Sequence, residues 1–338
     1  MPHRNPSQPD LLPAPADGRV RVMLTLPFAG PLDYLLPPRL ADARPGDIVT
    51  VPLGRRTETG VIWDAAPRLP PEFTPPPQKE VATSRLKPVA ARLDLPPLPA
   101  QLRQFVDWVA AYTLSPPGMV LAMALRANAL APLPRPATGW ATAQTLPADL
   151  RMTPARQKVL DAAAEGTPLT TTELARRAGA GAAVIRGLAQ AGALRAVEIA
   201  PPPPFARPDP AHCPPVLEGD QAEVATELRA RVAEDSFSIT LLEGVTGSGK
   251  TEIYMEAIAA CIAAGRQALV LLPEIALSAQ WTGRFSRRFG TEPALWHSDL
   301  GSRLRRVTWR AVADGTARVV VGARSALFLP FDQLGLII

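Results

Sequence analysis

The sequence has very little cysteine, and this shortage excludes several classes of protein. Its two cysteines, Cys213 and Cys261, can form neither a disulfide framework nor a four-ligand zinc site. Long apolar segments are missing too. An uncharged stretch at residues 109–125 is broken by Pro116, Pro117 and Gly118, and it falls short of the roughly 20 residues that span a bilayer. The N-terminal residues carry no apolar core of a secretory signal. We therefore expect a cytoplasmic protein without a membrane segment.

Neither charge sign is in large excess. The 36 lysines and arginines against 31 acidic residues give a net charge of +5, which permits a nucleic-acid partner without requiring one. With 338 residues, 47% of them hydrophobic and 20% charged, the chain has the composition of a globular protein with roughly two to three domains.

Proline is scarce after residue 215, and its distribution divides the chain. Of the 40 prolines, 37 lie at or before Pro215. Dense proline clusters mark extended linkers, because proline fixes φ and removes a backbone donor. The clusters at residues 70–77, 132–136 and 201–215 suggest three folded segments. We place these segments at residues 18–114, 151–200 and 216–338, with residues 201–215 as a proline-rich linker.

The segment at residues 18–114 is predicted to be a small β-rich domain. Apolar residues alternate with others over residues 20–26, which is the period of a half-buried strand. Two further strands are predicted at residues 47–53 and 59–63, next to turn-forming glycines. Helical spacing of apolar residues follows at residues 102–112.

The segment at residues 151–200 is predicted to be mainly helical. Thr153 can cap a first helix, a second is expected from Thr170 to Gly179, and a third over residues 182–192. A strand at residues 194–199 completes the outline of a winged helix-turn-helix. A structural helical spacer remains the alternative.

Strands and helices alternate in the segment at residues 216–338. Repeated β-α units with short connections predict a parallel sheet covered by helices, so the fold class is multidomain α+β and α/β. The predicted strands cover residues 239–242, 268–272, 294–297, 319–321 and 334–338, and the predicted helices cover residues 250–263, 277–289 and 302–313.

A phosphate-binding loop (P-loop) opens the first of these helices. The residues that match G-x-x-x-x-G-K-[ST] are Gly244, Val245, Thr246, Gly247, Ser248, Gly249, Lys250 and Thr251. Glycines let the backbone N–H groups face phosphate oxygens at the positive end of a helix. Lys250, one of four lysines in the chain, can reach the β- and γ-phosphates, and the Thr251 hydroxyl can bind Mg²⁺. We expect ATP and Mg²⁺ here, the alternative being a structural glycine-rich turn.

A P-loop alone does not distinguish a kinase, a transporter ATPase, a GTPase and a helicase, but neighbouring residues do. Gln221 lies upstream, where many helicases place a glutamine that reads adenine. The strings LLEGVTGSGKTEIY, ALVLLPEIALSAQ, HSDL and VVVGARSALFLPF, followed by LGLII, resemble the primosomal protein N′ family of bacterial replication-restart DNA helicases. PLDYLLP, PGDIVTVPLG and RLKPV look like that family's domain for the 3′ end of a DNA strand.

The resemblance implies the order 3′-end-binding domain, winged helix and RecA-like helicase lobe. It also implies ATP-driven 3′-to-5′ unwinding at stalled forks and restart of replication by primosome assembly. The expected partners are forked and single-stranded DNA, other primosome proteins and single-stranded DNA-binding protein. Two rival functions remain, namely a fork-binding adaptor without hydrolysis and a P-loop ATPase unrelated to nucleic acid.

Candidate DNA contacts follow from the same resemblance. Asp33 is expected to contact the terminal 3′ nucleotide, with Gly54 and Lys87 as neighbours. Leu32 stands where the family usually has an aromatic residue, which would stack on the base. The alternative is that Asp33 only turns the chain between strands. Arg324 and the segments after Pro273 and Gly322 are expected to lie along the DNA backbone, although Arg324 can equally serve in a salt bridge.

The resemblance also shows what this sequence does not contain. The family places an Asp-Glu-Glu-His string, the Walker B motif, after the strand corresponding to residues 334–338. Neither that string, nor a second motor lobe, nor a zinc-binding cysteine cluster follows here. We therefore expect an N-terminal fragment of a longer protein, inactive in hydrolysis by itself, with zinc bound only in the part that is missing.

Overall fold

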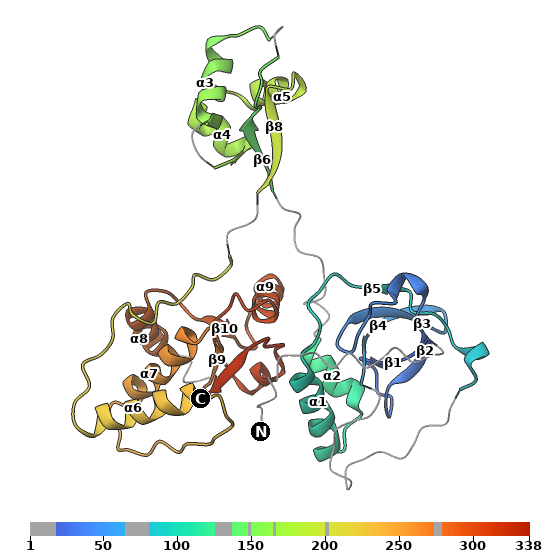
Figure 1. The fold of residues 1–338 in the computed structure, drawn as a ribbon, viewed down its shortest axis with the longest axis vertical. Coiled ribbons are helices and arrows are strands. Elements are labelled where there is room, and N and C mark those ends of the chain that lie inside the picture. The colour runs from blue at the N-terminus through green and yellow to red at the C-terminus, as the bar shows by residue number, and fades with distance from the viewer. Residues whose placement is uncertain are drawn as a thin grey trace, which may run out of the picture. The chain divides into compact units, whose positions relative to one another are not determined.

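The computed structural model describes residues 18–64, 81–125, 137–147, 150–164, 167–199, 203–273 and 279–338 (Figure 1). The chain divides into two compact units. Unit 1 comprises Met1–Ala131 together with Phe205–Ile338, and unit 2 comprises Pro132–Pro204. Unit 2 is therefore an insertion within the sequence of unit 1. The proline clusters at residues 70–77 and 132–136 lie outside the described residues.

Unit 1 begins with a five-stranded antiparallel sheet of order β2-β1-β4-β3-β5. Its strands are β1 (Arg19–Leu24), β2 (Leu32–Leu35), β3 (Ile48–Leu53), β4 (Arg56–Ile62) and β5 (Ala91–Arg92). The three predicted strands are confirmed in β1, β3 and β4. The short strands β2 and β5 were not predicted, because four and two residues are too few to carry a periodic signal.

Two helices cover one face of this sheet. Val22 and Leu24 of β1 lie in the core on one face, while Met23 is buried on the other, against α1 (Ala100–Tyr112) and α2 (Pro117–Ala124). The predicted helix at residues 102–112 is confirmed as α1. Because Met23 is only 2% exposed, β1 is buried on both faces at its end, where the sequence alternation had predicted one.

The second sheet of unit 1 is parallel, with the order β10-β11-β9-β12, and confirms the predicted α/β architecture. Its strands are β9 (Gln267–Leu271), β10 (Ala294–Trp296), β11 (Val319–Gly322) and β12 (Leu334–Ile337), and its helices are α6 (Asp220–Ala233), α7 (Lys250–Ala263), α8 (Ala279–Phe289) and α9 (Ser302–Ala313), with the 3₁₀ helix η6 (Arg324–Phe328). The first residues of the predicted helix at 277–289 lie outside the described part.

Alternate residues of the parallel strands enter two different cores. Ala268 and Val270 of β9 pack with α7 and α8 on one face. Leu269 on the opposite face packs with α9 and with residues of α1 and α2. The two sheets of unit 1 thus share a core.

The prediction of a strand at residues 239–242 is wrong. The side chains of Phe237, Ile239 and Leu241 are 92%, 86% and 80% exposed, and the backbone there forms no strand. A strand needs a neighbour to pair its N–H and C=O groups. In the described part of the sheet, β12 lies at the edge and pairs with β9 only. The apolar alternation favours a strand, but it does not show whether a partner is present.

The helices around the P-loop are joined by a buried ionic network. Glu256 of α7 accepts hydrogen bonds from Arg288 of α8 at 2.9 Å and from Arg229 of α6 at 3.3 Å. Glu256 and Arg288 are 7% and 5% exposed. Because a buried charge is costly without its partner, this network fixes α7 relative to its neighbours.

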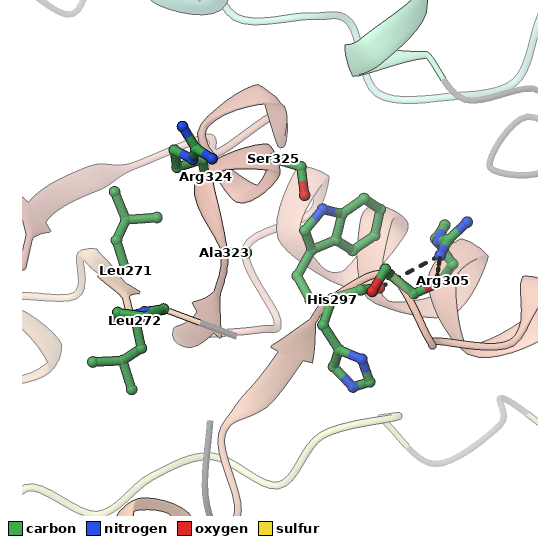
Figure 2. Close-up of a pocket in the computed structure, with 10 residues that line it drawn as sticks. Leu271, Leu272, His297, Arg305, Ala323, Arg324 and Ser325 are labelled. Carbon is green, nitrogen blue, oxygen red and sulfur yellow. Dashed lines mark hydrogen bonds between the residues drawn. The ribbon is translucent and has the colours of Figure 1, made fainter. Parts of the chain in front are cut away.

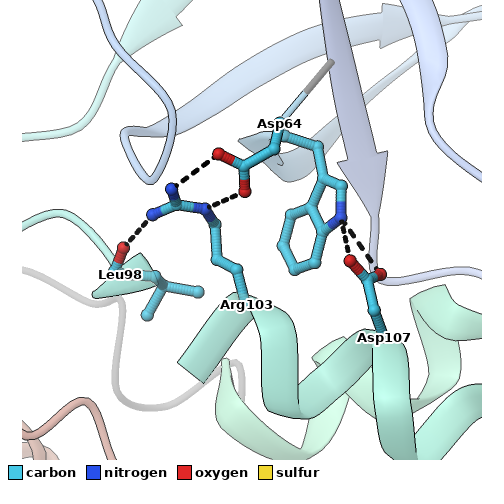
Figure 3. Close-up of polar contacts among 5 residues, drawn as sticks. Asp64, Leu98, Arg103 and Asp107 are labelled. Atoms are coloured by element: carbon cyan, nitrogen blue, oxygen red, sulfur yellow. Dashed lines mark hydrogen bonds and ion pairs between the residues drawn. The ribbon is translucent and has the colours of Figure 1, made fainter. Parts of the chain in front are cut away.

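Two polar contacts fasten α1 to the end of β4 (Figure 3). Arg103 donates to both carboxylate oxygens of Asp64, at 2.8 and 2.9 Å. The Trp63 indole N–H donates to Asp107 at 3.1 Å. Burial raises the pKa of Asp107 to about 6, against the opposing effect of the Trp63 hydrogen bond.

The α1–α2 pair is also joined to the parallel-sheet half of unit 1. The Trp309 indole N–H of α9 donates to the carbonyl of Ala124, at the end of α2, at 2.8 Å. The rings of Phe105 and Phe328 lie 5.3 Å apart, and both side chains belong to the shared core. Segments far apart in sequence are therefore packed as one body.

Unit 2 has the winged-helix outline predicted from the sequence. Its elements are β6 (Ala137–Thr142), α3 (Pro154–Ala164), β7 (Leu169–Thr170), α4 (Thr171–Ala178), α5 (Ala182–Gln190) and β8 (Leu194–Ile199), with the sheet order β7-β6-β8. Thr153 accepts from Arg156 N, and Thr170 forms a capping box with Glu173, as expected of helix starts. Gly179 ends α4 with φ of 60°. Strands β6 and β7 were not predicted.

Candidate nucleotide and nucleic-acid sites

The P-loop has the backbone shape that phosphate binding needs. Gly247 and Gly249 have φ of 83° and 81°, and α7 begins directly afterwards at Lys250. A Cβ at Gly244 would lie 2.6 Å from Ser248 Oγ, and a Cβ at Gly249 would lie 2.8 Å from Gln221 Nε2. Gly247 and Gly249 therefore require glycine for their conformation, whereas a Cβ at Gly244 would only have to displace the Ser248 hydroxyl. The curled loop at a helix N-terminus fits a polyphosphate.

The two polar side chains predicted for nucleotide binding meet at this loop. Lys250 Nζ donates to the carbonyls of Gly244 and Val245, at 2.6 and 2.9 Å. Gln221, in the first turn of α6, donates through Nε2 to the carbonyl of Ser248 at 3.0 Å. Thr251 follows in the first turn of α7. The lysine ammonium thus lies over the loop, where phosphate oxygens can replace the carbonyls as its acceptors.

The candidate 3′-end residues lie around the antiparallel sheet. Lys87 Nζ donates to the carbonyl of Gly54 at 3.5 Å, and the Lys87 carbonyl accepts from Leu35 N of β2 at 2.9 Å. Gly54 itself has φ of 60° in the turn between β3 and β4. Asp33 lies two residues before Leu35 on β2. The structure therefore brings Gly54 and Lys87 together beside the strand that carries Asp33.

The alternative of Asp33 as a turn residue is wrong, because Asp33 lies within β2 and pairs in register with Arg21. Its carboxylate forms an ion pair with Arg19 at 3.2 Å. Arg19 also donates to the carbonyl of Val81 at 2.8 Å. Leu32, next to Asp33, is half-buried and offers only an apolar surface.

A pocket of about 740 Å³ lies at the carboxyl ends of β9, β10 and β11 (Figure 2). Its lining residues are Leu271, Leu272, Pro273, Trp296, His297, Ser298, Arg305, Ala323, Arg324 and Ser325. Carboxyl ends of parallel strands are the usual ligand-binding edge of an open α/β sheet. The predicted DNA segments after Pro273 and Gly322 both start at this pocket, although residues 274–278 lie outside the described part.

Arg324 and Arg305 supply the positive charge of this pocket. Arg324 has no hydrogen-bond or ion-pair partner among the described residues, so the salt bridge considered for it from the sequence is not formed there. Arg305 donates to the carbonyls of Ser298 and His297, at 2.8 and 3.4 Å. Arg305 and His297 were not predicted as site residues. His297 carried a signal in the sequence, since the HSDL string begins where the predicted strand at residues 294–297 ends.

Among the described helices, none is both long and apolar enough to cross a membrane.

Comparisons with known proteins match both halves of unit 1. Residues 21–126 match the family model of the 3′ DNA-binding domain (3′BD) of PriA, and residues 220–338 match that of DEAD/DEAH box helicases. The first match extends past residue 114 through α2.

Curated relatives give the same result. The replication restart protein PriA of Rickettsia conorii is 29% identical over 321 residues, covering 94% of this chain and 36% of the relative. That of Bacillus subtilis is 39% identical over 176 residues, covering 52% and 22%. That of Rickettsia typhi is 45% identical over 124 residues, covering 37% and 18%. This chain spans at most 36% of the length of these three relatives.

Proposed function

Because this chain belongs to the PriA family of replication restart proteins, we propose that it forms the fork-recognising and ATP-binding part of a DNA helicase. The whole protein would unwind DNA in the 3′-to-5′ direction at stalled or abandoned forks and restart replication by primosome assembly. Its partners would be forked and single-stranded DNA, other primosome proteins and single-stranded DNA-binding protein.

The observation that carries the nucleotide part is the P-loop with Lys250 and Gln221 attached to it. Lys250 would exchange the Gly244 and Val245 carbonyls for the β- and γ-phosphates, and Thr251 would ligate Mg²⁺. The bound Mg²⁺ would neutralise charge on the phosphates during hydrolysis. The residues present fit this assignment, because the loop curls through two glycines of positive φ and ends at the N-terminus of α7, which begins at Lys250.

Gln221 supports adenine as the base. A glutamine amide has two N–H donors and one carbonyl acceptor. The hydrogen bond to Ser248 occupies one donor, so a donor and the carbonyl oxygen remain for N7 and the 6-amino group of adenine. Guanine has a carbonyl at that position and cannot donate to the amide oxygen. We therefore propose ATP, not GTP, as the nucleotide.

The DNA part rests on two separate places. Asp33, Gly54 and Lys87 would hold the 3′ end of a strand, and Arg324 would contact the backbone of single-stranded DNA at the ends of the parallel strands. Both places lie in unit 1 but on different sheets. Nucleotide binding and fork binding should therefore respond to different substitutions.

The test is to compare nucleotide and fork binding in one variant of the full chain. Lys250→Ala should weaken binding of a fluorescent ATP analogue by roughly tenfold or more, the loss expected for a hydrogen bond to a charged group. Fluorescence anisotropy with a labelled forked DNA should give an affinity within about twofold of the wild type. Equal loss of both would show that nucleotide and DNA share one surface and would overturn the assignment.

Base selectivity provides the second measurement. Gln221→Ala should reduce the preference for ATP over GTP, while Glu227→Ala on the exposed side of the same helix should leave it unchanged. A variant that loses affinity for both nucleotides equally would assign Gln221 a role in P-loop shape alone.

A further inference from the structure

The pocket at the strand ends combines positive charge with an apolar floor. Two arginines and one histidine line it, and no acidic side chain is among the lining residues. Leu271, Leu272 and Trp296 supply the apolar surface. An anion that carries a hydrophobic group suits this combination, and a nucleotide unit of single-stranded DNA has both parts.

Arg305 is held in place in the pocket by contacts with its neighbours (Figure 2). Its Nη2 donates to the carbonyls of Ser298 and His297, and its guanidinium carbon lies 5.9 Å from the centre of the Trp296 ring. The contact with Trp296, a buried residue, limits where the planar group can lie. No acidic side chain pairs with Arg305 among the described residues, so its charge is available to an anion.

The loop that Arg305 holds is fixed on its other side as well. Ala323 N donates to the carbonyl of Trp296 at 3.3 Å. A Cβ at Gly322 would lie 2.4 Å from that same carbonyl oxygen, so only glycine lets β11 approach β10 this closely. The β10 end, Arg305 and the segment that carries Arg324 are thereby arranged around one pocket.

We propose that Arg305 contacts a backbone phosphate of single-stranded DNA in this pocket, beside Arg324, and holds the His297–Ser298 loop in place for it. The proposal rests on the DNA role proposed above. A guanidinium has five N–H donors in a rigid fork. The loop carbonyls are bound through Nη2, so the donors on Nη1 and Nε remain for phosphate oxygens.

The experiment measures how the affinity of the full chain for an oligothymidylate depends on salt. The oligonucleotide carries a 3′-phosphate, so that recognition of a free 3′-hydroxyl does not contribute. Each phosphate contact that is lost should reduce the slope of log affinity against log salt by about 0.7 for a single strand. Arg305→Gln and Arg324→Gln should each show this reduction, with affinity roughly tenfold weaker at low salt.

Arg303→Gln is the matched control. Arg303 is an exposed arginine two residues earlier on α9, is not part of the pocket lining, and lies on a different side of the helix. It should retain the wild-type slope. Arg305→Lys keeps the charge but loses the planar guanidinium with its five donors. It should keep the slope while binding several-fold more weakly. Since it preserves the charge and most of the side chain, it also keeps the test meaningful if Arg305→Gln does not fold.

Each of four results would overturn the inference. A wild-type slope in Arg305→Gln, with weaker binding alone, would reduce Arg305 to a structural residue. An equal reduction in Arg303→Gln would indicate general surface charge. A reduced slope in Arg305→Lys would show that the retained charge does not make the contact. If the wild-type chain does not bind the oligonucleotide at all, the proposed DNA role fails together with this inference. The other results leave the DNA role standing, so the failure of the inference can be told apart from the failure of the proposed function.

Discussion

The two halves of unit 1 use their charged residues differently. In the β-rich half, residues 18–125, the charged side chains of the candidate site already contact other protein groups. Asp33 is paired with Arg19, which also holds the Val81 carbonyl, and Lys87 is bonded to the Gly54 carbonyl. In the P-loop half, residues 205–338, the buried network of Glu256 lies between helices. Lys250 and Arg305 donate to loop carbonyls, whereas Arg324 at the strand ends has no partner in the described part.

This difference indicates at which site a substitution can change DNA binding without changing the stability of the fold. A site whose charged groups also hold the fold must exchange partners when it binds DNA, so substitutions there should change binding and stability together. A site whose cation has no partner can bind an anion without breaking a protein contact. Substitutions there should change binding alone. The following predictions are arranged to test this contrast.

The largest effect is expected from the helix network of the P-loop half. Glu256→Ala leaves the buried Arg288 guanidinium without its carboxylate and should lower the free energy of unfolding of unit 1 by about 3–5 kcal/mol. Chemical denaturation measures this. Glu227→Ala removes an exposed partner of Arg231 at 3.6 Å and should cost less than about 0.5 kcal/mol. Similar losses in both variants would contradict the assignment of the network to the framework.

Asp107 should make the stability of unit 1 depend on pH. Its folded-state pKa of about 6 lies above the unfolded value of 3.8, so the stability from its protonated form is present below about pH 4. That stability is lost as the pH rises through 6. Asp107→Asn stays neutral and still offers Trp63 an oxygen acceptor. It should therefore be more stable than the wild type by about 2–3 kcal/mol at pH 8, and equal to it near pH 4.

Denaturation midpoints across this pH range provide the measurement. Asp42→Asn serves as the control, because Asp42 is 69% exposed and its pairing with Arg92 contributes little. A gain from Asp107→Asn that is the same at every pH would mean that packing, not titration, is responsible.

Asp33→Ala should change DNA selectivity and stability in one step. Oδ2 of Asp33 binds Arg19, which leaves Oδ1 to accept a hydrogen bond from a free 3′-hydroxyl. Loss of that bond should cost about 1.5–3 kcal/mol of binding to a fork with a 3′-hydroxyl, and should abolish the preference over a 3′-phosphate end. The lost ion pair should also cost up to about 1 kcal/mol of stability. Anisotropy of the full chain with the two forks measures the first effect.

Arg324→Gln is the control for this measurement, since it should weaken both forks alike. Equal affinity of the wild-type chain for hydroxyl and phosphate ends would leave Asp33 as a fold-stabilising residue of β2.

The smallest effect on stability is expected at Arg324. Arg324→Ala removes a side chain without a described partner, so the free energy of unfolding should change by less than about 0.5 kcal/mol. DNA binding should nevertheless weaken. Thermal unfolding of the full chain checks the first statement. A clear destabilisation would show that Arg324 supports the fold, and the contrast between the two halves would fail.

Local features of the fold were predictable from the sequence. The P-loop glycines, the capping box of Thr170 with Glu173 and the αL end of α4 at Gly179 depend on residues within a few positions of one another. The buried strands of the parallel sheet carry continuous apolar runs. Such short-range chemistry acts the same way whatever the rest of the chain does.

The unpredicted features depend on partners distant in sequence. The Trp63–Asp107 contact joins residues 44 positions apart, and the Trp309–Ala124 contact joins residues 185 positions apart. The two-residue strands β5 and β7 exist only because a neighbour pairs with them. The exposed segment at Ile239 shows the reverse case, because a strand-like pattern without a partner forms no strand. Arg305 was missed for the same reason, since it lines a pocket that is made by four separate segments.

The bond between Trp309 and the Ala124 carbonyl, with the core around it, has a consequence for how the protein can be divided. Unit 2 interrupts the sequence of unit 1, and the two parts of unit 1 that flank it in sequence are packed together around one core. Cutting the chain on both sides of unit 2 would release that unit as a separate piece. The flanking pieces would remain associated as a non-covalent pair, as in a reconstituted split protein. The β-rich half expressed alone would expose the apolar surface that α9 and Phe328 now cover.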